Sequence, residues 1–202
     1  MFLYLYNTPV MYVDNTGTLP EWIEDIGRFF CGAIITLSAI VLTTTTVLLL
    51  LIPGAASVPL FTLNMAAYGA MLMLSPFSGK IKSDMSNIGW NPFNDDESLV
   101  LSSSNISFYK SVFVIRYGGK STIGGGISFL VIGIGRGETR LSTVRHEYGH
   151  HKQQRLLGLG LYTPVVAIPS LISAATSSNN THSNRWYEKW ATNWGNRGFI
   201  WW

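Results

Sequence analysis

The chain contains little cysteine and little charge. Cys31 is the only cysteine among its 202 residues, which excludes an intramolecular disulfide and a cysteine-based zinc site. Charged residues make up 12% of the chain, about half of the usual share of about 25%, whereas 47% of the residues are hydrophobic. This composition argues against a disordered chain and is compatible with contact with a membrane.

The excess of basic over acidic residues is also small. A formal net charge of +3 is too slight to indicate a nucleic-acid partner, and the sequence shows no basic stripe with interleaved aromatic residues. The length suits one domain, or a small domain with appendages. We therefore expect no nucleic-acid function.

Residues 29–79 contain no charged side chain. Residues 29–52 are long enough to cross a bilayer core of about 30 Å as a helix, Pro53 and Gly54 interrupt the run, and a second apolar run follows. The pattern predicts an apolar helical hairpin within residues 21–79. Two interpretations stay open: a segment that inserts into or crosses a membrane, or a buried hairpin packed on the rest of the protein.

The second half of the chain has an α+β pattern. Residues 105–117 and 127–134 are rich in β-branched and aromatic side chains and predict two strands. Helices are predicted at 138–157, ended by a glycine, and at 185–195. Residues 80–98, which contain Asn, Pro and Asp, are predicted to form a linker.

Three of the four histidines lie within six residues, at His146, His150 and His151. With Glu147 they form the pattern H-E-x-x-H. On a helix, residues four apart lie on one face, so His146 and His150 can bind one metal ion. Glu147 then lies beside the metal, where a carboxylate can take a proton from a bound water. The pattern predicts a zinc-peptidase site; the alternative is two surface histidines on an ordinary helix.

A catalytic zinc needs three protein ligands and one open position. The extended motif with a third downstream histidine is not present, because Gln153 and Leu156 occupy its glycine and histidine positions. Beyond His151 the chain has one acidic residue, Glu188, and one further histidine, His182. The third ligand is therefore Glu188 or His182, if a zinc ion is bound.

Glu188 begins a Glu-x-x-Ala sequence that ends at Ala191 and resembles the gluzincins, metallopeptidases whose third zinc ligand is a glutamate on a second helix. Small Ala191 and Gly149 would let the two helices approach closely. Some gluzincins have an aspartate, which hydrogen-bonds a ligand histidine, where this chain has Thr192. The longer run of residues 138–195 resembles predicted zinc-peptidase toxin domains attached to bacterial Rhs-type proteins.

The resemblance implies a zincin-like fold for residues 99–202, with a small sheet and two active-site helices. It implies zinc bound by His146, His150 and Glu188, with Glu147 as the general base. His182 is then a hydrogen-bond donor to the transition state, or a loop residue. A protein or peptide is the implied substrate.

The first residues have a second resemblance. The pattern Y-x-Y-x-x-P-x-x-Y-x-D-x-x-G spans Tyr4 to Gly17 and resembles the end of the core domain in Rhs/YD-repeat proteins, although Asn15 replaces the usual proline. Those proteins carry a variable toxin domain directly afterwards. The resemblance implies that residues 1–20 close such a core, and that the protein is a secreted or membrane-associated effector with an immunity protein as a partner. The alternative is an ordinary strand and turn.

Other side chains near the motif carry weaker expectations. We expect His151 at the surface or as an outer contact, Tyr148 in the core, and Tyr187 as a candidate to stabilise an oxyanion. The tryptophans of the last helix, spaced four residues apart, predict a packing face. Three function classes stay open: a zinc endopeptidase, a membrane-inserting toxin fragment with a structural metal site, and an inactive remnant of an Rhs protein.

Overall fold

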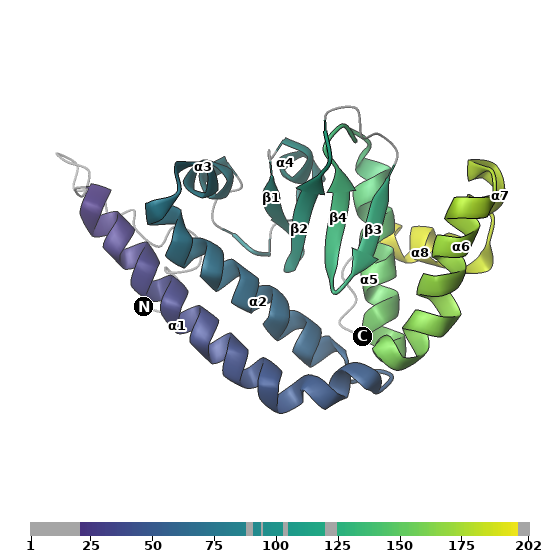
Figure 1. The fold of residues 1–202 in the computed structure, drawn as a ribbon, viewed down its shortest axis with the longest axis horizontal. Coiled ribbons are helices and arrows are strands. Elements are labelled where there is room, and N and C mark those ends of the chain that lie inside the picture. Colours follow the sequence, from purple (N-terminus) through teal and green to yellow (C-terminus); the bar gives the residue numbers. More distant parts are fainter. Residues whose placement is uncertain (1–20, 88–90, 94, 103–104, 120–124, 198–202) are drawn as a thin grey trace.

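The computed structural model describes residues 21–87, 91–93, 95–102, 105–119 and 125–197, so the predicted core-closing segment 1–20 lies outside the described residues. The fold is α+β and mostly helical, as predicted, with a small mixed sheet and apolar helices at the N-terminal side (Figure 1). The helical elements are α1 (Glu21–Thr46), the 3₁₀ turn η2 (Val47–Leu51), α2 (Ser57–Leu74), the 3₁₀ turn η3 (Ser75–Phe77), α3 (Gly79–Asn87), α4 (Glu97–Ser102), α5 (Leu141–Tyr162), the π-helical turn η4 (Thr163–Ala167), α6 (Ile168–Thr176), α7 (Asn179–Ser183) and α8 (Trp186–Asn196). The strands are β1 (Ile106–Tyr109), β2 (Val112–Tyr117), β3 (Gly126–Phe129) and β4 (Val131–Gly135).

The sheet has the order β1-β2-β4-β3, with β2 and β4 parallel and the two outer pairs antiparallel. The two strand predictions are wrong in one respect: each predicted strand folds as a hairpin of two strands. The turns escape sequence reading because they contain no glycine or proline. Lys110 and Ser111 form one turn and Leu130 the other, all with positive φ angles.

Two buried amide side chains hold the turn at Leu130. The Leu130 N–H donates to Oε1 of Gln154 at 2.8 Å, and the Leu130 carbonyl accepts from Nδ2 of Asn64 at 3.3 Å. Gln154 belongs to α5 and Asn64 to α2, so helices on both sides of the sheet support a conformation that a leucine rarely adopts. The turn is fixed by tertiary contacts.

Helices cover both faces of the sheet. On one face Val112, Val114 and Ile132 pack with Val144 and Tyr148 of α5. On the opposite face, Phe108 packs with side chains of α2 and α3. Side chains alternate between the two faces along each strand, which is why neighbouring residues enter different clusters. The site helix α5 is therefore built on a buried sheet.

The helical hairpin predicted at residues 21–79 is present as α1 and α2 (Figure 1). The helices approach closely because Gly32 faces the backbone of Gly69 and Met73, where a Cβ atom would overlap. α2 is the inner helix: buried Asn64 accepts a hydrogen bond from the Phe113 N–H at 2.5 Å, which ties α2 to the sheet. α1 packs on α2 and keeps its outer side exposed.

Three helical stretches of the described chain are long and apolar enough to cross a membrane, judged by length and composition: Glu21–Leu51, Ser57–Phe77 and Leu141–Thr176. They differ in how much of their apolar sequence the fold buries. Within an apolar 18-residue segment of each stretch, 6% is buried in the first and 39% in the second. The hairpin therefore combines a core helix with an outer helix that has no cover over most of its length among the described residues.

The predicted linker at residues 80–98 contains two helices, α3 and the start of α4. α3 is more than a connection because Met85 is fully buried beside Phe108. The predicted helix 138–157 also continues past its expected end. Gly158 has a φ of 66° and kinks α5, which continues to Tyr162.

Candidate metal centre

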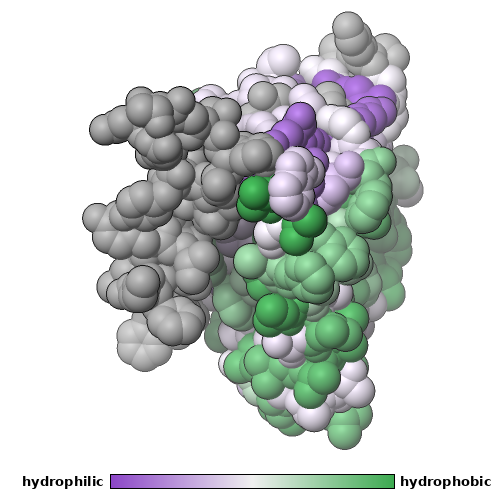
Figure 2. Space-filling view, turned by 90° about the vertical axis from the view of Figure 1, so that its left-hand side faces the viewer, coloured by the Kyte–Doolittle hydropathy of each residue, from purple (hydrophilic) through white to green (hydrophobic). Residues whose placement is uncertain are grey.

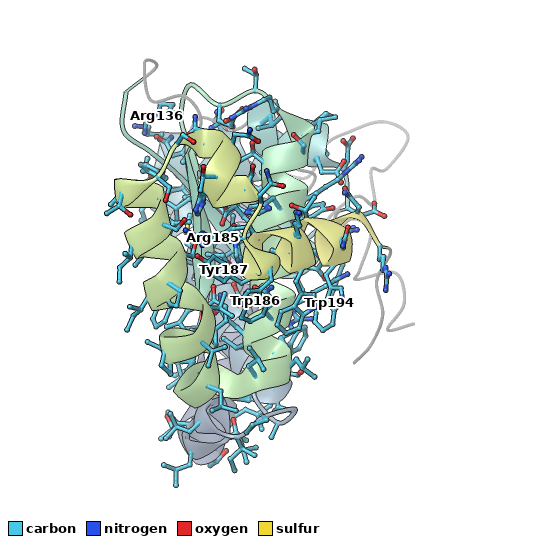
Figure 3. All side chains as sticks on the ribbon, turned by 90° about the vertical axis from the view of Figure 1, so that its right-hand side faces the viewer. Arg136, Arg185, Trp186, Tyr187 and Trp194 are labelled. Atoms are coloured by element: carbon cyan, nitrogen blue, oxygen red, sulfur yellow. The ribbon has the colours of Figure 1, made fainter. Side chains whose placement is uncertain are left out.

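The H-E-x-x-H residues lie in the first half of α5. Helix α8, which carries the labelled Trp186, Tyr187 and Trp194 in Figure 3, crosses α5 at this level. Two glycines allow the crossing. A Cβ atom on Gly149 would overlap the backbone carbonyl of Ala191, and one on Gly195 would overlap the carbonyl of Arg145. The close approach of Gly149 and Ala191, which the sequence predicts, thus brings Glu188 of α8 over the histidines of α5.

His146, His150 and Glu188 converge on one point. Nε2 of His146 lies 3.0 Å and Nε2 of His150 lies 3.1 Å from the same carboxylate oxygen, Oε2 of Glu188. All three ligand atoms lie within 4.8 Å of one another. Nε2 of His182 lies 3.7 Å from the other oxygen, Oε1. The structure therefore brings together the two histidines of the motif and both downstream candidates.

The donor set fits a divalent metal. Zinc takes imidazole nitrogen and carboxylate oxygen at about 2.0–2.2 Å, which places tetrahedral ligand atoms about 3.3 Å apart, close to the observed separations. Oε1 of Glu188 is buried and has no hydrogen-bond partner of good geometry among the described residues, although the Ser170 hydroxyl lies near. The convergence point is Oε2, so what fits a bound cation is the donor set itself: two imidazole nitrogens close to one buried carboxylate oxygen.

Both motif histidines have a partner on their other ring nitrogen. Nδ1 of His146 lies 2.9 Å from the hydroxyl of Thr192, and Nδ1 of His150 lies 2.8 Å from Oε1 of Gln153. Gln153 also donates from Nε2 to the Tyr187 carbonyl of α8 at 2.9 Å. With Nδ1 as donor to these partners, the lone pair of Nε2 would be available to a metal ion; in the structure both Nε2 atoms contact Oε2 of Glu188.

Sequence reasoning left the partner at Thr192 in question and missed Gln153 entirely. The available signal for Gln153 was its position three residues after His150, on the same side of the helix.

Glu188 is 1% exposed and Glu147 is 5% exposed. Burial opposes ionisation of Glu188, but hydrogen bonds from His146 and His150 outweigh it and hold the pKa of this carboxyl well below its usual range. Burial raises the pKa of Glu147 to about 7, against a lowering effect of His146. The two pKa values differ because Glu188 has direct hydrogen-bond partners that outweigh burial, whereas burial dominates at Glu147.

Glu147 also depends on a glycine of the sheet. A Cβ atom on Gly126, the first residue of β3, would overlap the Glu147 carboxylate. The missing side chain lets Glu147 lie against the edge strand. Gly126 thus positions Glu147, a role that the sequence concealed within a run of three glycines.

A cleft of about 670 Å³ opens above these residues. β3 forms one wall, η4 and α6 form the other, and His146, Glu147, His150, His182 and Glu188 line the cleft. β3 is an edge strand of the described sheet, so its outer backbone groups border the cleft. The arrangement has room for a polypeptide segment beside the metal-binding group.

Of the side chains near the motif, His151 does not lie where the sequence suggested. His151 is fully buried and stacks on Tyr148, with 6.4 Å between ring centroids, because its side of α5 faces the core. Tyr148 is a core residue, as expected. The hydroxyl of Tyr187 donates to the Pro169 carbonyl at 3.0 Å and so fixes the start of α6 to α8.

The tryptophan stripe of α8 is not its buried face. Trp186 is 57% exposed and stacks on Trp190, which packs edge-on against Trp194. The buried residues of α8 are Tyr187, Glu188, Ala191 and Gly195. Where α8 meets the backbone of α5, at Ala191 and Gly195, the approach is too close for an indole ring.

Comparisons of the chain with protein-family models, curated proteins and solved structures return no match. The described residues form a His-His-Glu group able to bind a metal ion, in a cleft beside a buried glutamate.

Proposed function

We propose that the protein is a zinc-dependent endopeptidase. The observation that carries the proposal is the meeting of His146, His150 and Glu188 at one carboxylate oxygen, with Glu147 next to them and an edge strand alongside. Two imidazoles and one carboxylate form the ligand set of catalytic zinc sites that keep one position open. The separate placement of Glu147, which does not join the group, leaves it available for proton transfer.

The chain's own residues supply the remaining chemistry. A bound zinc ion supplies Lewis acidity, which activates a water molecule and polarises a peptide carbonyl. Glu147 accepts a proton from the attacking water and returns it to the leaving nitrogen as the peptide bond breaks. His182, 3.7 Å from Glu188 at the side of the cleft, donates a hydrogen bond to the developing oxyanion.

β3 supports a polypeptide as the substrate class. An extended peptide can lie antiparallel or parallel to an edge strand and hydrogen-bond its outer backbone groups. On β3 this leaves the backbone of Gly126, because the Ser128 carbonyl already accepts from Nε2 of Gln154 and from the Tyr162 hydroxyl. Gly126 to Phe129 provide such an edge directly beside Glu147. A small-molecule hydrolase has no need of this strand, which is why we favour peptides.

The test combines metal content with cleavage of a broad peptide library. Glu147→Gln should keep one zinc ion per chain and lose cleavage, because the amide cannot accept a proton. Glu188→Ala should lose zinc and cleavage together. Asp95→Asn, the same change of charge at an exposed loop position, should retain both. Full cleavage in Glu147→Gln, or equal zinc in Glu188→Ala, would overturn the proposal.

One observation supports a second candidate function. The outer side of α1 is apolar and exposed, as in a membrane-inserting fragment whose metal has only a structural role. Leakage of dye from liposomes that survives Glu147→Gln, together with zinc binding but no peptide cleavage, would favour this candidate. Leakage that is absent from the wild type would exclude it.

The biological setting is also a proposal. We infer an effector released by, or associated with, an Rhs-type protein, delivered to a target cell and neutralised by an immunity protein. The support is the sequence pattern within residues 1–20, which lie outside the described residues. A neighbouring reading frame whose product binds this chain and blocks its activity would agree with the inference; a neighbour without either effect would argue against an immunity protein.

A further inference from the structure

The fold brings two uncharged stretches of sequence together at one end of the molecule. Residues 29–79 and 156–184 contain no Asp, Glu, Lys or Arg. They meet where η2 packs on the end of α5: the Gly54 N–H donates to the Leu156 carbonyl at 2.7 Å, and Gly158 lies against the backbone of Ile52. The exposed side chains around this contact form what we call the apolar pole: Leu48, Leu51, Ile52, Leu156, Leu161 and Val165.

Charge and hydropathy are separated along the molecule. In Figure 1 η2 lies at the lower end, and Figure 2 shows apolar residues covering the lower part of the surface, with hydrophilic residues gathered above. At the other end of the hairpin, Lys82 of α3 pairs with Glu21 at 2.6 Å and with Asp25 at 2.9 Å. A protein surrounded only by water gains nothing from this separation, because exposed apolar patches promote aggregation.

The polar groups near the apolar pole are satisfied within their own helix. The hydroxyls of Thr43 and Thr44 donate to the carbonyls four residues earlier, at 2.7 and 2.9 Å. Thr45 and Thr46 both donate to the Leu42 carbonyl, at 3.0 and 2.6 Å. An unsatisfied donor in lipid costs several kcal/mol, so side chains bonded in this way remove an obstacle to burial in hydrocarbon.

The same structure argues against a hairpin that spans the bilayer. Asn64 ties α2 to the sheet through Phe113 and Leu130, so α2 cannot cross a membrane unless it leaves the sheet. The pole is also held to α5 by the close contact of Gly160 with Leu51. The folded protein can therefore enter a bilayer from one side only, with the apolar pole first.

The wall of the metal-site cleft continues into this surface. Ile168 and Leu171 of α6 line the cleft and are also 48% and 57% exposed. α6 follows η4, which carries Val165 of the apolar pole. A polypeptide held in the bilayer thus has a continuous apolar path from the pole to the metal-binding residues.

We propose that the apolar pole inserts into one leaflet of a phospholipid bilayer, so that the cleft opens at the membrane surface and acts on polypeptides anchored there. The membrane contact stands independently of the peptidase activity, whereas the choice of substrate rests on it. The occupant is lipid rather than a second copy of the chain, because a dimer interface does not require the separation of charge that the hairpin shows.

The first experiment is flotation of the full chain with phosphatidylcholine vesicles at physiological salt. The wild type should float with the vesicles. The double substitution Leu48→Gln/Leu51→Gln should reduce the bound fraction at least tenfold. The matched control Leu74→Gln/Leu141→Gln, which alters two exposed leucines away from the pole, should float like the wild type. Thermal unfolding checks that all three are folded.

Two outcomes would overturn the membrane contact. In one, the wild type stays in the dense fraction, or the pole and control variants float equally. In the other, the wild type is a stable dimer in detergent-free buffer, and the pole substitutions make it monomeric without any change in vesicle binding. That second result would identify the pole as an interface between copies of this chain.

The second experiment compares one library of peptides free in solution and attached to vesicles through an acyl chain. Anchored peptides should be cleaved about tenfold faster or more, because a shared surface raises their effective concentration. The pole variant should lose this gain and keep the rate on free peptides. Equal rates for free and anchored peptides would overturn the choice of substrate. No cleavage of either would overturn the peptidase proposal, and flotation would still decide the membrane contact.

Discussion

The hydroxyl of Thr192 lies 2.9 Å from Nδ1 of His146, at the exposed side of the crossing between α5 and α8. His150, deeper in the crossing, has the amide oxygen of Gln153 in the same role. Both partners are neutral. A neutral acceptor fixes the tautomer of the histidine without adding negative charge to the site.

Replacing Thr192 should therefore weaken metal binding without removing it. Thr192→Val keeps the shape of the side chain and loses the acceptor, and we expect zinc affinity to fall about tenfold, the lower part of the range for partners of ligand histidines. Competition with a chromophoric chelator measures this change. Thr192→Asp should restore or strengthen binding. Thr176→Val, which loses only a bond to its own helix, should leave zinc affinity unchanged; an equal loss there would show that the effect is not local.

The close crossing of the helices predicts opposite effects for one substitution at two sites. Gly149→Ala places a methyl group on the Ala191 carbonyl and should cost several kcal/mol or prevent folding, because backbone atoms cannot move aside singly. Gly27→Ala, in α1 with nothing within 4 Å, should stabilise the protein by about 0.5–1 kcal/mol. Urea unfolding measures both. A neutral Gly149→Ala would show that α8 does not pack as described.

The sequence predicts local elements better than their connections. The hairpin, the helix around His146 and the last helix follow from apolar runs and helix-ending signals, which act locally. The two strand hairpins do not, because Leu130 enters its turn only through contacts with Gln154 and Asn64. Those partners lie 24 and 66 residues away, and no local pattern reports them.

The residues of the candidate site also divide into those that sequence spacing predicts and those that only the tertiary structure reveals. His146 and His150 are found by their spacing, and the few downstream histidines and acidic residues leave Glu188 and His182 as candidates for the third ligand. Gly126 could not be found, because its part is to leave space for Glu147, and an absent side chain has no sequence signal of its own. His151 was placed wrongly because the face of α5 that meets the core depends on where the sheet lies.

Removal of the metal should loosen the α5–α8 crossing. Without a metal ion, Glu188 contacts the histidines through hydrogen bonds. A ligand that binds only the folded state adds about 2.7 kcal/mol to the free energy of unfolding when it is present at a hundred times its dissociation constant. We expect addition of a chelator to lower the unfolding temperature and added zinc to restore it. Glu188→Ala should unfold at one temperature with or without zinc; a shift of wild-type size in that variant would remove Glu188 from the ligand set.

Glu138 should make the protein sensitive to acid. Its carboxylate accepts from the guanidinium and the N–H of Arg140 and from the Thr139 N–H, and the side-chain bond with Arg140 leads in lowering the pKa of Glu138 to about 2. The folded pKa lies below the unfolded value, so this stabilisation is complete above about pH 4.5 and is lost as the pH falls towards 2.

The expected size of this contribution is about 1–3 kcal/mol, at the lower end because Arg140 is exposed to solvent. Urea unfolding of the wild type and of Glu138→Gln at pH 7 and at pH 3 measures it. The difference between the two proteins should shrink at the lower pH. Arg140→Gln should reproduce part of the loss at pH 7, and a difference that does not change with pH would contradict the assignment.

Gly126 offers a way to move Glu147, the proposed general base, without touching the proposed metal ligands. Gly126→Ala forces the Glu147 carboxylate away from β3, and a displacement of about 1 Å in a catalytic group can cost about a hundredfold in rate. Zinc content should remain at the wild-type level. The double variant Gly126→Ala/Glu147→Asp should recover part of the rate, since the shorter side chain vacates the space that the methyl group takes. Glu147→Asp alone should be slower than the wild type, so recovery in the double variant relative to Gly126→Ala reports the contact itself. Additive losses in the double variant would show that Gly126 and Glu147 act independently.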